Sequence, residues 1–197
     1  MGKDYIEVNS FGKVFPKKGA NARTPYEHQK NAMENLDIIN KSNEYSTMIV
    51  LPTGGGKTYT ASMWLLKNAL NLKKKILWIA HRQMLLDQAA ESFQKFAYSE
   101  VIPHIPFFQY RIVSGSSCHD RSIDIKAADN LLIVSKDSIG RNLNCLDSWM
   151  AGEKEIFLII DEAHHSTAKT YRRVIEYVQT RVPNVKLIGL TATPFRT

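Results

Sequence analysis

The sequence predicts an α/β domain in which a doubly wound, mainly parallel sheet carries helices on both faces. Two observations lead to this prediction. Short and nearly continuous apolar runs recur along the chain, as in strands that are covered on both faces. Segments with helical periodicity lie between these runs, and such strand–helix alternation is typical of a parallel sheet.

The predicted strands are apolar runs that end just before polar or glycine-rich segments. They are residues 48–51, 76–80, 131–134, 156–160 and 187–190, with 111–113 as a further candidate. Ligands bind such sheets at the carboxyl ends of the strands. We therefore expect the segments that follow these runs to meet at one edge of the sheet.

The predicted helices show the apolar stripe of an amphipathic helix. The stripe runs through residues 85–96 in one segment and 171–178 in another, and a third helix is expected over 57–70. Residues 99–110 and 114–129 are rich in proline, aromatic or polar residues, so we interpret them as connectors.

The chain divides into an arm and one domain. Residues 1–22 are polar and basic, and we predict an N-terminal arm for which disorder is favoured over contact with nucleic acid. Residues 23–197 are expected to form a single domain, because the glycine-rich and acidic segments described next must meet in one fold.

The composition favours anionic partners and a reducing compartment. The net charge is +7, from 26 Lys and Arg against 19 Asp and Glu. No apolar run approaches the length of a membrane span, and the first residues lack the apolar core of a signal peptide. Cys118 and Cys145 lack metal-binding spacing and fit a reduced protein, so we expect a cytoplasmic location and no membrane partner.

The segment LPTGGGKT at 51–58 predicts a phosphate-binding loop. Its glycines let backbone N–H groups approach phosphate oxygens, Lys57 supplies positive charge, and the Thr58 hydroxyl can ligate Mg²⁺. The strict pattern has Gly at the position of Leu51, so the alternative is a glycine-rich turn that caps a helix. The predicted nucleotide-binding residues of this segment are Thr53, Gly54, Gly55, Gly56, Lys57 and Thr58.

The segment DEAHH at 161–165 predicts the catalytic acids. Asp161 would hold Mg²⁺ through water, and Glu162 would act as general base on the attacking water. The alternative is an acidic turn that caps the next helix. His164 and His165 are adjacent and cannot share a helix face, which argues against zinc, and we expect His164 to hydrogen-bond beside the γ-phosphate. Lys57 completes the predicted catalytic set.

Together with TAT at 191–193, these segments resemble the first motor domain of superfamily-two helicases and translocases, a RecA-like P-loop NTPase fold, over residues 23–197. They are similar to motifs I, II (in its DEAH form) and III. The sequences of motif II and of GLTATPFR at 189–196 most resemble those of one branch. This branch contains the type I and type III restriction-enzyme motor subunits and the XPB-like DNA helicases. The resemblance implies the ATP-binding half of a DNA helicase or translocase that couples ATP hydrolysis to movement.

The resemblance also implies roles for residues outside motifs I and II. Arg23 and Gln29 belong to a segment similar to the adenine-sensing Q motif, and an amide can both donate to and accept from adenine. Thr191 and Thr193 would couple the nucleotide state to the grip on nucleic acid. The alternative for Gln29 is an ordinary residue on a surface helix, and the alternative for Thr191 and Thr193 is a plain strand end.

Two further segments resemble motifs that touch the nucleic-acid backbone. His81 and Arg82 follow one predicted strand, and Ser135 and Lys136 follow another. Their contacts with phosphates would give affinity without sequence information. The alternative for all four is an ordinary polar strand end.

The resemblance implies partners as well. These are DNA in preference to RNA, a second RecA-like domain, and nuclease or specificity subunits. No segment here can form that second domain, which supplies arginine fingers, so we expect this chain to be part of a longer protein. Alone it should bind ATP weakly and turn it over slowly or not at all.

Two other functions fit parts of the pattern. One is an ATP-gated nucleic-acid-binding module without its own turnover, against which the intact Glu162 argues, because such a module needs no general base. The other is a different P-loop enzyme, such as a kinase or small GTPase. The chain has no guanine-reading Asn-Lys-x-Asp segment, and its DEAH segment argues against both enzymes.

Overall fold

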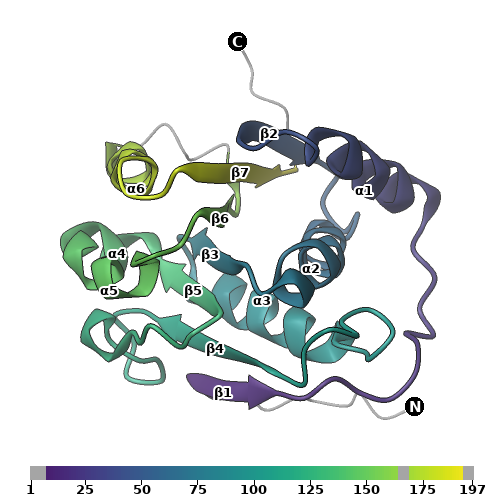
Figure 1. Cartoon of the computed structure of the whole chain (residues 1–197), viewed down its shortest axis with the longest axis horizontal. Coiled ribbons are helices and arrows are strands. Elements are labelled where there is room, and N and C mark those ends of the chain that lie inside the picture. The colour runs from purple at the N-terminus through teal and green to yellow at the C-terminus, as the bar shows by residue number, and fades with distance from the viewer. Residues whose placement is uncertain (1–7, 164–168, 193–197) are drawn as a thin grey trace.

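The computed structural model describes residues 8–163 and 169–192, and in these residues seven strands form one sheet in the order β1-β4-β5-β3-β6-β7-β2 (Figure 1). All neighbouring pairs are parallel except β1 with β4. The strands are β1 (Phe11–Val14), β2 (Tyr45–Val50), β3 (Lys75–Ala80), β4 (Phe108–Val113), β5 (Leu131–Ser135), β6 (Glu155–Ile160) and β7 (Asn184–Thr191). The predicted α/β class is confirmed.

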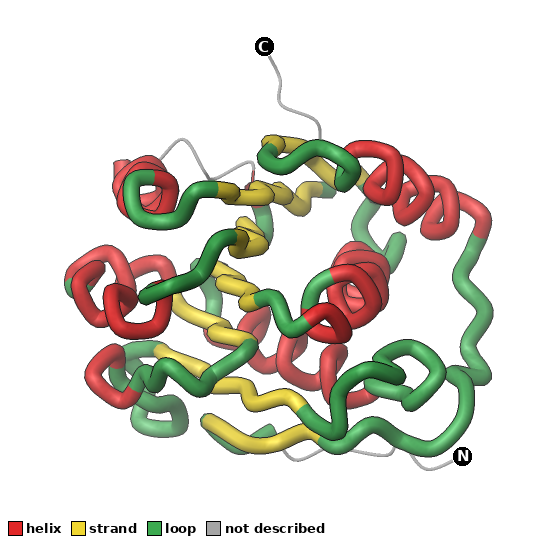
Figure 2. Tube along the Cα trace, in the orientation of Figure 1, coloured by secondary structure: helices red, strands yellow, loops and turns green. Residues whose placement is uncertain are grey.

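Helices cover both faces of the sheet, as Figures 1 and 2 show. One face carries α1 (Glu27–Ile39), α2 (Lys57–Asn68) and α3 (Gln83–Phe96). The other carries α4 (Lys136–Arg141), α5 (Asp147–Met150) and α6 (Lys169–Gln179). Three 3₁₀ turns complete the described part, η1 (Leu70–Leu72), η2 (Ser122–Asp124) and η3 (Leu143–Leu146). No helix of the described residues is both long and apolar enough to cross a membrane.

The two faces bury two separate hydrophobic cores, which explains the continuous apolar runs. All six residues of β3 are buried, and successive side chains of a strand point to opposite faces. Trp78 packs edge-on against Phe93 of α3, with ring centroids 5.8 Å apart, on one face. Leu77 and Ile79 enter the core beneath α4 and α6 on the other.

The predicted disorder of residues 1–22 is wrong for the part that the structure describes. Phe11–Val14 forms the edge strand β1 and pairs antiparallel with β4. Beyond it, the Lys17 backbone N–H donates to Ala97 O at 2.8 Å. A polar sequence can form this strand because an edge strand is held by ladder hydrogen bonds to one neighbour and needs little apolar surface of its own.

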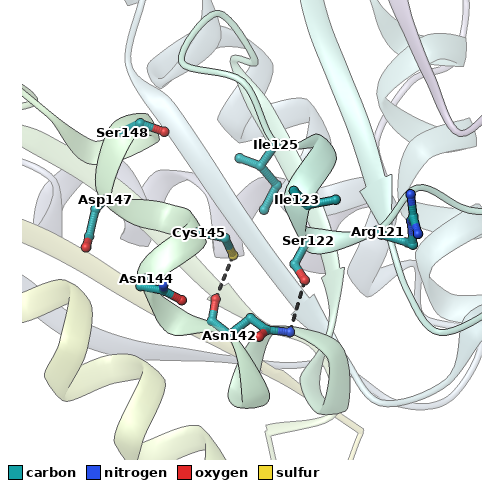
Figure 3. Close-up of a pocket in the computed structure, with 9 residues that line it drawn as sticks. All are labelled: Arg121, Ser122, Ile123, Ile125, Asn142, Asn144, Cys145, Asp147 and Ser148. Carbon is teal, nitrogen blue, oxygen red and sulfur yellow. Dashed lines mark hydrogen bonds between the residues drawn. The ribbon is translucent and has the colours of Figure 1, made fainter.

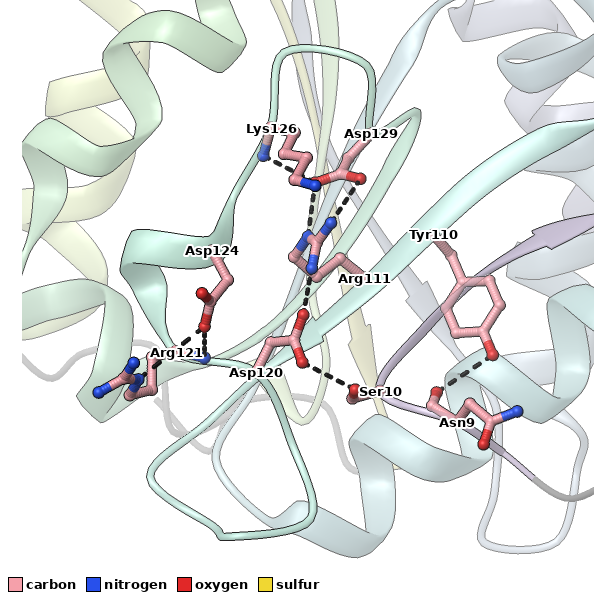
Figure 4. A network of polar contacts seen from close by, with 9 residues as sticks. All are labelled: Asn9, Ser10, Tyr110, Arg111, Asp120, Arg121, Asp124, Lys126 and Asp129. Carbon is pink, nitrogen blue, oxygen red and sulfur yellow. Dashed lines mark hydrogen bonds and ion pairs between the residues drawn. The ribbon is translucent and has the colours of Figure 1, made fainter.

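A buried ion-pair network ties β4 to the segments around it (Figure 4). Arg111 of β4 is only 5% exposed, and its Nε donates to Asp129 Oδ2 at 2.7 Å. Its Nη1 also donates to Asp120, which in turn accepts from Ser10 Oγ at 2.7 Å. The backbone N–H of Lys126 completes the shell of Asp129 at 2.9 Å. The long β4–β5 connection is thus fixed to the sheet.

We predict that Asp129→Ala lowers the free energy of unfolding by about 3 kcal/mol, because it leaves the buried Arg111 guanidinium without the more buried of its two carboxylate partners. Urea denaturation measures the change. The control is Asp124→Ala in the same connection, where the exposed carboxylate should contribute less than about 1 kcal/mol. Equal losses in the two variants would contradict a buried role for Asp129.

Candidate functional site

Parallel pairing brings the predicted motifs to one edge of the sheet. Val50 pairs with Thr191, and Ile79 pairs with Ile160, so the loops after β2, β7, β6 and β3 follow one another along the carboxyl edge. Only β7 separates the phosphate loop from the acidic segment. The predicted meeting of these segments at one edge is confirmed for the described residues.

The phosphate loop has a backbone that only glycine adopts readily. Gly54 and Gly56 have φ angles of 78° and 81°, in the left-handed region, and Gly56 caps α2, which begins at Lys57. A Cβ on Gly56 would lie 2.4 Å from Nε2 of Gln29. The α2 helix therefore starts directly at the loop, with its positive dipole end and Lys57 beside the predicted phosphates.

Gln29 holds this loop against α1. The residue is 1% exposed, its Nε2 donates to Gly55 O at 2.9 Å, and its Oε1 accepts from the Tyr26 backbone N–H at 3.0 Å. His28 Nε2 also lies 3.1 Å from Gly55 O. The sequence analysis missed this positioning role, although a Gln at the third position of a helix is a known capping signal. The adenine-reading role of Gln29 stays a prediction.

Arg23 lies on an aromatic ring beside α2. Its guanidinium sits 4.0 Å from the centroid of Tyr59, and it lines a small cavity of about 240 Å³ together with Thr58 and Phe96. This stacking contact is a cation–π interaction. The adenine-sensing role of Arg23 stays a prediction. Thr53, another predicted nucleotide-binding residue, is exposed in the glycine-rich loop.

Asp161 emerges from β6 into a buried position. It is 2% exposed, and its Oδ1 accepts from the Glu162 backbone N–H at 2.9 Å. Burial raises the pKa of Asp161 from 3.8 to about 6, assisted by the negative charge of Glu162 and opposed by that hydrogen bond and by Lys57. Its Oδ2 has no hydrogen-bond partner among the described residues. This carboxylate oxygen is buried and can accept a further bond.

These residues fit a magnesium ion. A buried carboxylate oxygen without a partner is costly, and a hydrated cation would satisfy it. Mg²⁺ is usually held by one or two protein oxygens, with waters and nucleotide phosphates completing its shell. Asp161 and the Thr58 hydroxyl would be the two protein groups.

Glu162 is held in an unusual backbone conformation. Its φ angle is 52°, one of two positive values outside glycine among the described residues. Its Oε2 lies 3.3 Å from His81 Nε2, and Arg82 Nε lies 3.0 Å from the same nitrogen. Because one ring nitrogen either donates or accepts, it donates to Glu162 only in the state in which it carries the proton. The structure thus brings a predicted nucleic-acid contact against the predicted general base, a pairing that the sequence did not indicate.

A second polar pocket adjoins this pair, at the ends of β3, β4 and β5. Its volume is about 320 Å³, and its lining includes His81, Gln83, Ser114, Ser135, Ser138 and Arg141. Ser135 caps α4 by accepting from the Ser138 N–H at 3.2 Å, and the Lys136 ammonium lies 5.8 Å from the Tyr171 ring. Both residues thus also have structural contacts, and their phosphate-binding role stays a prediction.

Tyr171 of α6 is a further residue near the acids. It is fully buried, and its hydroxyl has no hydrogen-bond partner among the described residues. Burial, together with the charges of Asp161, Asp137 and Glu162, raises the pKa of Tyr171 to about 12. The sequence placed Tyr171 on the apolar face of a helix, and nothing in that pattern indicated that it lies near the acids.

Thr191, the last residue of β7, is fully buried, and its carbonyl accepts from the Leu51 N–H at 3.1 Å. This bond joins motif III to the start of the phosphate loop. The predicted roles of His164 and Thr193 lie outside the described residues.

A further cavity lies away from these motifs (Figure 3). It has about 650 Å³ between η2 and the η3–α5 segment, and no predicted site residue lines it. Ile123 and Ile125 form its apolar side, and Cys145 lies opposite. Burial raises the pKa of the Cys145 thiol to about 11, so this thiol is not activated as a nucleophile.

This fold and its carboxyl-edge motifs define a P-loop nucleotide-binding domain. Residues 23–196 match the family model described as "Type III restriction enzyme, res subunit". The chain belongs to that family, and the resemblance to restriction-enzyme motor subunits is confirmed.

Relatives and a solved structure agree with this assignment. The chain is 29% identical over 153 residues to "ATP-dependent DNA helicase mph1" of Neurospora crassa and 28% identical over 181 residues to "Type I restriction enzyme EcoAI endonuclease subunit" of Escherichia coli. These alignments cover 76% and 89% of this chain but only 12% and 20% of the relatives. The chain therefore spans at most a fifth of these two proteins.

The fold is similar to that of the Pyrococcus furiosus Hef helicase domain. The TM-score is 0.57 at 24% identity, over 84% of this chain and 33% of the other. At this identity the likeness concerns the fold, and it agrees with the RecA-like architecture expected from the sequence.

We predict that Gln29→Ala weakens ATP binding about tenfold, because the Gly55 carbonyl and the Tyr26 N–H lose a buried partner. Binding is measured by calorimetry with ATP and with inorganic tripolyphosphate. If Gln29 positions the loop, both ligands weaken, whereas an adenine reader would affect ATP alone. Lys30→Ala, exposed on the same helix, is the control.

We predict that Asp161→Asn stabilises the nucleotide-free protein by about 2 kcal/mol at about pH 8. The raised pKa means that the folded state holds a proton that the unfolded state has released between about pH 4 and pH 6. Stability therefore falls as pH rises through this window, and the neutral amide removes that loss. Urea denaturation near pH 4 should show no gain.

The control for this prediction is Glu34→Gln, which neutralises an exposed carboxylate on α1 and should change stability little at either pH. A gain in Asp161→Asn that persists at low pH would contradict burial of the charge as its cause.

Proposed function

We propose that this chain is the ATP-binding half of a DNA helicase or translocase motor that couples ATP hydrolysis to movement on nucleic acid. One observation carries the proposal. The proposal is supported by a glycine-rich loop with left-handed glycines, a buried carboxylate with one unpartnered oxygen and a second carboxylate, which lie along one short stretch of the carboxyl edge of the sheet. This is the set that phosphoryl transfer to water requires.

Each protein group has a role in that reaction. The loop N–H groups and Lys57 would bind the β- and γ-phosphates, and Lys57 would neutralise charge that develops on them. Asp161 and Thr58 would hold Mg²⁺, which supplies further neutralisation when bound. Glu162 would accept a proton from the attacking water.

Nucleic acid as the partner is supported by the adjoining pocket and by the relatives. The pocket of about 320 Å³ presents hydroxyl, imidazole and guanidinium groups, which suit phosphates, beside one carboxylate, that of Asp137. The chain carries a net charge of +7. DNA is favoured over RNA because relatives carry the names "ATP-dependent DNA helicase" and "restriction enzyme".

Further partners follow from the same proposal. The motor would need a second RecA-like domain to close the ATP cleft, and restriction-type relatives support nuclease or specificity subunits as neighbours. A cytoplasmic location remains our prediction, and both described cysteines are free thiols, which accords with it.

An ATP-gated binding module without turnover is the second candidate. It is favoured by the contact of Glu162 with His81 at 3.3 Å, which occupies the predicted base in this structure. The two functions differ in whether Glu162 contributes to turnover.

We predict that Glu162→Gln lowers Mg²⁺-dependent ATP turnover about 100-fold while ATP affinity stays within about threefold, because the amide cannot accept the proton. Turnover is measured on this chain with duplex DNA, single-stranded DNA and RNA, and binding is measured in parallel. Duplex DNA should stimulate most, and added salt should abolish the stimulation. Since this chain alone is expected to turn over ATP slowly, the assay uses protein in excess over ATP, so that single turnovers are detected. Equal rates in Glu162→Gln and the unmodified chain would favour the binding module.

Lys57→Ala should abolish ATP binding itself, since it removes the charge at the phosphates. Its matched control is Lys67→Ala, an exposed lysine on the same helix, which should bind and turn over ATP like the unmodified chain. ATP binding that survives Lys57→Ala would count against the proposed phosphate site.

A further inference from the structure

His81 and Glu162 are brought together by the pairing of adjacent strands. Ile79 of β3 lies opposite Ile160 of β6, and the Asp161 N–H donates to Ile79 O at 2.8 Å. This bond extends the ladder past the end of β6, so the first residues beyond both strands lie side by side. His81 Nε2 and Glu162 Oε2 are 3.3 Å apart as a result.

The main chain restricts where the Glu162 side chain can go. Its φ of 52° is a left-handed conformation that costs a non-glycine residue free energy, and its N–H is committed to Asp161 Oδ1. The side chains of His81 and Glu162 are 20% and 27% exposed, so solvent competes only partly for their contact. The contact therefore restrains the carboxylate.

The other side of His81 faces the adjoining pocket. His81 lines this pocket of about 320 Å³ together with Arg141 and the hydroxyls of Ser135 and Ser138. Arg82 lies next to it, with its Nε 3.0 Å from the same imidazole nitrogen. One ring nitrogen either donates or accepts, so the state that restrains Glu162 is the one in which Nε2 carries the proton and donates to Oε2. A phosphate that enters this pocket would meet these donors and the charge of Arg141, with the Asp137 carboxylate of the lining as an opposing charge. It would compete with Glu162 for His81.

We propose that His81 is a positioning residue that restrains Glu162 until a nucleic-acid phosphate occupies the adjoining pocket and draws the imidazole away. This inference rests on the proposed motor function and deepens it, since it names how occupancy of the nucleic-acid surface reaches the general base. A carboxylate released from the imidazole is free to orient toward the attacking water.

The contact can be tested without nucleotide, by NMR of the histidine rings at constant pH. The His81 signals are assigned by their absence from the spectrum of His81→Gln. The chemical shifts of these signals should change in Glu162→Gln. They should also change when a short DNA duplex is added to the unmodified chain. His104 is the internal reference, because it hydrogen-bonds to Asn71 of η1, at the end of α2 away from the loop. Its chemical shifts should not change.

Turnover provides the second readout. Without nucleic acid, His81→Ala should turn over ATP about tenfold faster than the unmodified chain, because it removes a hydrogen bond to a charged group. Its stimulation by DNA should shrink by the same factor. His81→Gln, whose amide can donate from a similar position, should restore slow turnover. His104→Ala is the matched control and should match the unmodified chain.

His81 signals that do not change in Glu162→Gln would overturn the contact between His81 and Glu162. His81 signals that do not change at saturating DNA would overturn the release of Glu162 on DNA binding. Faster turnover in both His81→Ala and His81→Gln would also overturn the restraint. If the chain binds no ATP while DNA still displaces the His81 signals, the motor function is overturned and the contact with its release is supported.

Discussion

Parallel pairing between β3, β6, β7 and β2 is the constraint on which the site depends. Since the four strands run in one direction and in close register, their carboxyl ends bring the predicted phosphate loop and the acidic residues to one edge. The backbone bond from Leu51 to Thr191 and that from Asp161 to Ile79 extend this ladder into the loops. The distances between catalytic groups are therefore set by strand spacing, which side-chain substitutions change little.

The site is built at a cost in stability. Asp161 is buried where its charged form is disfavoured, Glu162 adopts a left-handed backbone, and Tyr171 buries a hydroxyl without a described partner. Each of these three features opposes folding, and all three lie at or near the predicted catalytic acids. The apolar cores on the two faces of the sheet compensate for these costs. The strands that stabilise the fold therefore also carry the strained residues at their carboxyl ends.

The sequence predicted the fold class, six of the seven described strands and the segments that meet at the site edge, because continuous apolar runs and glycine-rich loops are local signals. It missed β1, whose stability comes from pairing with β4, and it missed the contact between His81 and Glu162. The role of Gln29 in holding Gly55 was also missed. Such contacts join residues far apart in the chain, so they depend on strand order, which no local pattern encodes.

The place of β2 at the border of the sheet has a thermodynamic consequence. In the described sheet this strand has β7 as its one neighbour, and Met48 and Val50 are partly exposed. Amide protons of such a border strand exchange through local opening that needs only one ladder to part. A ligand that bridges the loop after β2 to the groups after β6 must oppose that opening. Nucleotide occupancy and hydrogen-exchange protection of β2 are therefore linked quantities, each a measure of the other.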